Sequence, residues 1–112
     1  MSKWTFLTNH SQVLLCIARN RRSTAREIAA KVGITERAVQ RLLRDLEETG
    51  YISHIREGRH NYYVIHPERP MRHPAQHGHA IRELLDLLTP LDHPDRLADA
   101  SDLDIEESAT ER

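Results

Sequence analysis

Three arginines and a glutamine are spaced so that one helix would carry them on a single face. Arg37, Gln40, Arg41 and Arg44 fall within the segment TERAVQRLLRDLEE. At ~100° per residue around a helix, the four side chains occupy a stripe of roughly 100°. Arginine can donate two hydrogen bonds to guanine, and glutamine can pair with adenine in the same two-point manner. The stripe has the chemistry of a surface that reads base edges, although a charged helix face often does no more than keep a protein solvated.

The same segment holds the apolar residues that would fix this helix to a core. Thr35 can cap its first turn, the helix is expected to run to Glu48, and Gly50 ends it. The acidic residues Asp45, Glu47 and Glu48 come toward the far end of the segment. Four aliphatic residues lie on the side opposite the stripe: Val39, Leu42, Leu43 and Leu46.

Two helices are expected to precede this one. Asn9 and Gln12 offer a capping box for a helix with a broad apolar face. The motif TARE contains a second capping box and predicts a short helix over Ala25–Val32, with Gly33 suited to the left-handed residue that follows it. A short helix, a tight turn and an arginine-bearing helix therefore follow one another along the chain.

After the third helix, the spacing of the apolar residues changes from that of a helix to that of a strand. Residues 52–65 alternate in two runs interrupted at Gly58, which predicts a β-hairpin with Arg56, Arg59 and His60 near its tip. Three prolines make residues 67–74 a stiff extended connector.

Beyond the connector, an apolar stripe predicts a fourth helix from about Ala75 to Leu88. Residues 89–112 are acidic, with only scattered aliphatic residues, and are expected to form a mostly disordered tail.

The stretch STAREIAAKVGITERAVQRLLRDLEETGYISHIREGRHNYYVI resembles a winged helix-turn-helix domain of the kind found in MarR-like and ArsR-like regulators. The resemblance covers roughly residues 9–66. It implies that Ala25–Val32 is the support helix, Thr35–Glu48 the recognition helix and Ser53–Ile65 the wing. In such domains the recognition helix enters the major groove of DNA.

The fold class expected is therefore mainly α with a small β-hairpin, a winged helix-turn-helix plus a C-terminal helix. The expected division is a DNA-binding domain at 1–66, a connector at 67–74, a dimerisation helix at 75–88 and the tail at 89–112. The residues expected to contact DNA are Thr35, Glu36, Arg37, Gln40, Arg41, Arg44, Arg56, Arg59 and His60.

The charge of the chain is divided unevenly. Residues 1–88 carry 14 Lys and Arg against 9 Asp and Glu, whereas residues 89–112 carry 2 against 8. The net charges are thus +5 and −6, and a basic domain beside an acidic segment favours a polyanionic partner. No apolar run is long enough for a membrane span, and the first ten residues lack the apolar core of a signal peptide. Cys16 is the single cysteine and is expected to be a small core residue in a reducing cytoplasm.

Apolar residues near both ends of the chain exceed what a three-helix core can bury, which predicts a homodimer. The alternative is that the fourth helix folds back onto its own domain. The expected dimer residues are Trp4, Phe6, Ile81, Leu84, Leu85 and Leu88.

Eight histidines raise the possibility of a metal-responsive sensor. His73 and His77 would stand one helical turn apart, a spacing that can bind zinc or nickel. Pro74 lies between them, so solvated or dimer-contact histidines are the favoured interpretation and no cofactor is expected.

Three classes of function were compared. A DNA-binding transcriptional regulator is favoured, and a winged-helix protein-interaction module is the alternative. An enzyme is rejected, since the chain has no glycine-rich phosphate loop, zinc-protease motif or nucleophile–base pair. Double-stranded DNA is the expected partner, no membrane is expected, and no small-molecule effector is assigned.

Overall fold

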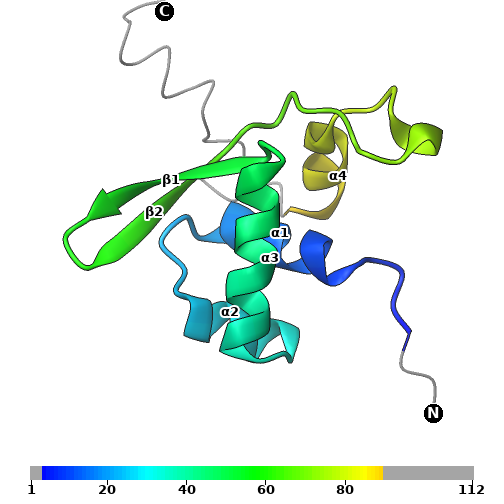
Figure 1. The fold of residues 1–112 in the computed structure, drawn as a ribbon. Helices are drawn as coiled ribbons and strands as arrows, with labels where there is room; N and C mark the ends of the chain where they lie inside the picture. Colours follow the sequence, from blue (N-terminus) through cyan, green and yellow to red (C-terminus); the bar gives the residue numbers. More distant parts are fainter. Residues whose placement is uncertain (1–3, 90–112) are drawn as a thin grey trace, which may run out of the picture.

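The computed structural model describes residues 4–89 and shows four α-helices, one short 3-10 helix and a two-stranded hairpin in that part of the chain (Figure 1). The predicted fold class, mainly helical with a small β-hairpin, is confirmed. The elements in chain order are α1 (Asn9–Arg19), α2 (Ala25–Val32), α3 (Glu36–Glu48), β1 (Ile52–Glu57), β2 (His60–Ile65), the 3-10 helix (Pro74–Gln76) and α4 (Ile81–Leu88).

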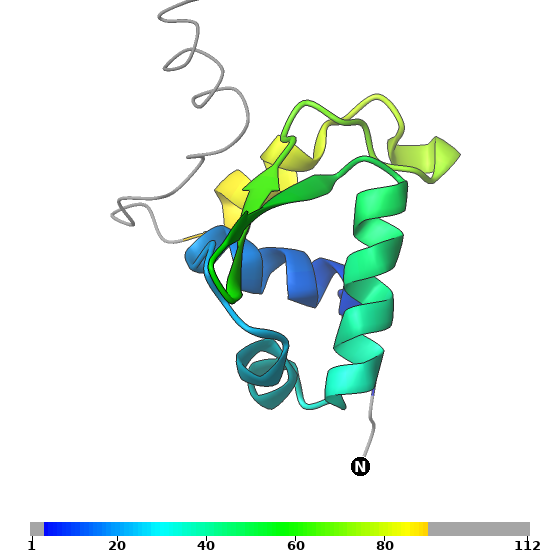
Figure 2. The ribbon, with the colours of Figure 1, turned by 60° about the vertical axis from the view of Figure 1, so that its left-hand side comes forward.

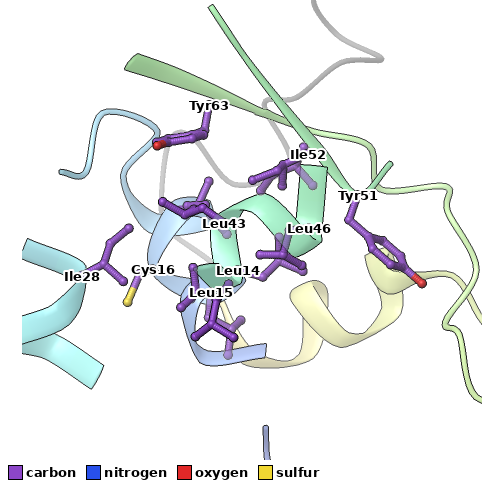
Figure 3. Close-up of a cluster of buried hydrophobic side chains, with 14 of the residues drawn as sticks. Leu14, Leu15, Cys16, Ile28, Leu43, Leu46, Tyr51, Ile52 and Tyr63 are labelled. Carbon is purple, nitrogen blue, oxygen red and sulfur yellow. The ribbon is translucent and has the colours of Figure 1, made fainter. Parts of the chain in front are cut away.

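The core lies where α1, α2 and α3 meet the base of the hairpin. α1 runs across the axis of α3, and α2 packs against both of them (Figure 2). Leu14 of α1, Leu43 and Leu46 of α3, and Ile52 and Tyr63 of the hairpin gather in this core (Figure 3). Because α3 is clamped along one side only, its opposite face stays at the surface.

The single cysteine lies in this core, as predicted. Cys16 is buried on α1. Burial raises the pKa of its thiol above the ordinary value, and the positive charges of Lys31 and Arg19 oppose this rise only in part. A thiol in this setting behaves as a small apolar side chain.

Capping residues set the starts of the first three helices. The Thr24–Glu27 capping box is present, and Thr35 accepts a hydrogen bond from the Ala38 amide, both as predicted. The prediction for α1 was wrong by one residue, because Thr8 caps the helix and Asn9 is its first residue. The Thr8 side chain accepts the amide hydrogen bond of the residue three positions on, which supplies one partner that a helix end lacks.

The predicted hairpin, called the wing below, is confirmed. β1 and β2 pair antiparallel, with Ile52 opposite Ile65 at the base and Glu57 opposite His60 at the tip. Gly58 adopts a positive φ of 61°, which a side chain would oppose, and so permits the tight turn. The base of the wing is buried and its outer part is exposed, so the tip projects away from the helices (Figure 1).

The segment after the wing folds back against the domain. The sequence predicted a stiff extended connector here and did not predict these contacts. Pro67 is fully buried, and the Arg69 side chain donates hydrogen bonds to the carbonyls of Thr49 and Gly50 at the end of α3. Pro70 forms an isolated β-bridge with Ala80. The segment is therefore anchored at several points along its length.

The predicted helix over residues 75–88 was wrong in its first half. Only a 3-10 turn at Pro74–Gln76 forms there, and α4 begins at Ile81. The reason is long-range pairing, since the Met71 amide donates to the His79 carbonyl and the Ile81 amide donates to the Arg69 carbonyl. These hydrogen bonds hold residues 79–81 beside residues 69–71, which an α-helix through position 75 would prevent.

The predicted dimer residues on α4 divide into two groups. Ile81 and Leu85 are 5% and 3% exposed within a single chain, where α4 packs on α1. Their own domain covers these two residues, as in the alternative that the fourth helix folds back, and the homodimer stays a prediction. Leu84 and Leu88 are only half-buried, whereas Leu87 is 78% exposed. Among residues 4–89, no helix is long and apolar enough to cross a membrane.

Candidate nucleic-acid interface

The arginine stripe of α3 is at the surface, as the helical spacing predicts. Val39, Leu42, Leu43 and Leu46 are buried, which fixes the opposite face outward. The outward residues surround one shallow hollow along the N-terminal part of the helix. Its lining is Thr35, Arg37, Ala38, Gln40, Arg41 and Arg44.

The three arginines and the glutamine of this hollow have no partners within the part of the chain that the structure describes. Arg37, Gln40, Arg41 and Arg44 make no hydrogen bond or ion pair there. By contrast, the neighbouring Glu36 forms an ion pair with Arg26 of α2 at 3.4 Å. Three guanidinium groups and one amide are thus free to bind a ligand without first breaking internal bonds.

Two of the three carboxylates at the other end of α3 are paired with histidines. His10 of α1 contacts Asp45 at 2.9 Å, and His54 of β1 contacts Glu47. These pairs hold negative charge on the side of the helix that faces α1 and β1. Glu36, which is next to Arg37 in the sequence, is likewise paired, with Arg26 of α2.

The wing presents its predicted cations in two different ways. The Arg56 side chain donates to the Gly58 carbonyl at 3.0 Å and to Asn61 at 3.3 Å, so it is engaged in shaping the turn. Arg59 and His60 are exposed, and within residues 4–89 neither side chain has a hydrogen-bond or ion-pair partner. These two residues are the ones available at the tip.

A second hollow connects the wing to α3. Gln40 borders it from the recognition helix, and Arg59 and His60 border it from the wing. Because Gln40 also borders the first hollow, the two form a continuous polar surface. The loop before α2 completes the second hollow through Arg22, Ser23, Thr24 and Ala25.

Sequence reasoning missed Arg22. Its guanidinium forms an ion pair with Glu57 of β1 at 3.1 Å and lies 4.8 Å from the centre of the Tyr62 ring on β2. Arg22 therefore contacts both strands of the wing. The adjacent Arg21 is buried and donates to the carbonyls of Ile17 and Ala18 at the end of α1. The doubled arginine in the sequence was the signal, but the sequence did not show which of the two faces outward.

The predicted histidine pair does not form the geometry that a metal site would need. His73 and His77 flank a 3-10 helix instead of lying one turn apart on an α-helix. The His73 ring accepts a hydrogen bond from the Ala75 amide at 3.0 Å. Across residues 4–89, no group of three or more His, Cys, Asp or Glu side chains is placed to hold a metal ion.

The fold and this surface together define a helix-turn-helix with a wing. Residues 7–53 match the family of winged helix-turn-helix DNA-binding domains. The matched residues hold α1, α2, α3 and the start of β1, and the observed fold is a winged helix in which α2 and α3 form the helix-turn-helix and the hairpin is the wing. No curated protein matches the chain.

Proposed function

We propose that this protein is a sequence-specific transcriptional regulator that acts as a homodimer in the cytoplasm and has no enzymatic role. α3 enters the major groove of DNA, and the wing lies on the adjacent backbone or minor groove. The observation that carries the proposal is the unpartnered polar face of α3, in which Arg37, Gln40, Arg41 and Arg44 stand together on a matched DNA-binding domain. The MarR-like or ArsR-like subtype stays a prediction.

The two hollows support a division of labour on DNA. Arginine and glutamine side chains in the first hollow have the two-point geometry that distinguishes guanine and adenine in the major groove. Arg22, Arg59 and the first turn of α2 border the second hollow, where they suit phosphate oxygens. Glu57 lies near the wing tip, which favours contact with the backbone over deep insertion into the minor groove.

We infer the homodimer from the way in which helix-turn-helix proteins read DNA. One recognition helix covers only a few base pairs, and two-fold dimers place two such helices in successive major grooves. Trp4, Phe6, Leu84 and Leu88 remain as candidate contacts, because they are at least partly exposed in a single chain.

The proposal is tested by selecting bound sequences from random DNA and then measuring affinity across a salt series. We expect an inverted repeat with half-sites one helical turn apart. With about four phosphate contacts, affinity for random DNA should fall on the order of a hundredfold between 50 and 200 mM salt. A protein-interaction module would enrich no sequence and show no steep salt dependence, and that result would overturn the proposal.

A further inference from the structure

A groove that shares no lining residue with the hollow at the arginine stripe is large enough to hold one or two side chains. Its volume is about 360 Å³, and it opens between α1, the C-terminal end of α3 and the segment before α4. Leu14, Leu46, Met71 and Leu84 contribute its apolar walls. The surface of the groove is thus mostly apolar.

The lining of this groove favours an aromatic occupant. Tyr51 contributes a ring that is held in place by its hydroxyl, which donates to the Pro70 carbonyl at 2.6 Å. Met71 contributes a thioether, and Arg72 an exposed guanidinium that has no hydrogen-bond or ion-pair partner within residues 4–89. An aromatic ring gains from all three neighbours, through ring–ring, sulfur–aromatic and cation–π contacts.

The chain carries a pair of exposed aromatic side chains of the kind that this groove would bind. Trp4 and Phe6 are 68% and 91% exposed, and they are the only Trp and Phe in the sequence. Their rings form an edge-to-face pair with centroids 5.0 Å apart. We call residues 4–6 the aromatic arm. Exposed aromatic clusters of this kind mark interaction surfaces.

The arm is directed away from the groove of its own chain. Leu7 packs against the core and Thr8 caps α1, so the base of the arm is anchored at the groove rim. The backbone at Thr8 is extended, and from there the chain leaves the body of the domain (Figure 1).

We propose that the aromatic arm of one copy fills the groove of a second copy, and that the exchange is reciprocal. This inference rests on the homodimer proposed above and names its contact. Residues 4–8, from the arm to the cap of α1, span at most ~17 Å. The two-fold axis must therefore pass close to the start of α1.

The area involved is sufficient for a stable dimer. A buried Trp or Phe side chain covers 150–250 Å². Two arms and the two grooves that receive them would together bury on the order of 1,200 Å², the lower end of the range for specific interfaces. Because Leu46 and Asp45 of α3 border the groove, the contact also braces the end of the recognition helix.

The single tryptophan makes the docking directly measurable. A donor protein, Leu84→Arg, keeps its arm but has a blocked groove. An acceptor protein, Trp4→Ser with Phe6→Ser, keeps its groove but contributes no tryptophan signal. Each variant alone should be monomeric by light scattering. When acceptor is added to donor, we expect the Trp4 emission of the donor to shift to shorter wavelength and saturate, since the indole leaves water.

Matched controls separate docking from misfolding. Acceptor carrying a further Met71→Glu substitution, which blocks the opposite groove wall, should produce no shift. Leu87→Arg adds the same charge on α4 at a position outside the groove, and should dimerise like the wild type. Circular dichroism establishes that each variant is folded.

The outcomes also distinguish this inference from the proposed homodimer. A wild-type dimer whose donor emission is unmoved by acceptor would overturn the arm contact and leave the homodimer standing. A donor that is already blue-shifted alone would place the arm on its own chain and overturn the exchange. A wild type that stays monomeric at 100 µM or so would remove both, while DNA binding by α3 would still be measured separately.

Discussion

The two halves of the recognition helix differ in what their polar side chains contact. In the first half, Arg37 and Arg41 are exposed and have no partner among residues 4–89. In the second half, Asp45 and Glu47 pair with histidines of α1 and β1. One helix thus carries unpaired cations at one end and side chains bonded to neighbouring elements at the other.

This division has an energetic reason. Binding DNA through a side chain that is already paired would first break that internal contact, whereas an unpaired arginine exchanges only water for a base or phosphate. The C-terminal half gains from the opposite arrangement. The Arg69 guanidinium bonds the carbonyls of Thr49 and Gly50, which are the groups that a helix end leaves without partners. Because the C-terminal end of α3 is held in place, its N-terminal end keeps a defined orientation relative to the rest of the domain.

The largest effect on function is expected from substitutions in the N-terminal half of α3. Arg37→Ala and Arg41→Ala should each weaken operator binding by roughly 5- to 150-fold, because a good two-point base contact is worth about 1–3 kcal/mol. Combined, they should abolish specific binding. The free energy of unfolding should change little, since both side chains are exposed. Fluorescence anisotropy with operator DNA and urea denaturation measure the two quantities.

The matched control is Arg82→Ala, which removes the same charge from α4. It should leave operator affinity nearly unchanged, because any loss would come only from long-range attraction. If Arg37→Ala and Arg82→Ala weaken operator binding equally, net charge rather than base reading drives the interaction, and the assignment of the recognition face fails.

The second-largest effect is expected from a substitution at the C-terminal end of α3. Gly50 has a φ of 88°, and a Cβ there would overlap the Arg69 guanidinium. Gly50→Ala should lower the free energy of unfolding by about 2–3 kcal/mol. Roughly 1–2 kcal/mol arises from the left-handed backbone and about 1 kcal/mol from the displaced Arg69 hydrogen bonds. Chemical denaturation measures this change.

Gly33 provides the control for that prediction. It has a φ of 85°, but a Cβ there would meet nothing within 4 Å, so Gly33→Ala should cost only the backbone part. In an Arg69→Ala background, the cost of Gly50→Ala should fall to that of Gly33→Ala. Equal costs of the two glycine substitutions in the wild-type background would show that Arg69 does not hold the end of α3.

The contrast between the two halves also explains what the sequence could predict. The bounds of α3 and its outward face follow from local signals, namely a capping threonine, a helical stripe of leucines and a terminal glycine. The pairing of Asp45 with His10 could not be predicted, because it joins residues 35 positions apart. The same limit explains the wrong helix at 75–80, where hydrogen bonds to residues 69–71 override the local pattern.

The smallest effect is expected from residues 91–112, which can act on the N-terminal half of α3. These residues lie outside the described part of the chain, and they carry 8 Asp and Glu against 2 Arg. A tethered acidic segment can compete with DNA phosphates for unpaired cations such as Arg41 and Arg44. Non-specific binding should suffer more than operator binding, because it depends almost entirely on counterion release.

Deleting residues 91–112 should therefore tighten binding to random DNA several-fold at low salt, and operator binding by less. The gain should fade as salt approaches 0.15 M or more, where the Debye length shrinks to ~8 Å. A control chain in which the acids of this segment become Asn and Gln keeps its length and should behave like the deletion. If that control instead binds random DNA like the wild type, bulk rather than charge explains any effect of the deletion. If the deletion itself changes nothing at low salt, residues 91–112 do not compete for the recognition face, and the unpaired arginines of α3 are open to DNA at all times.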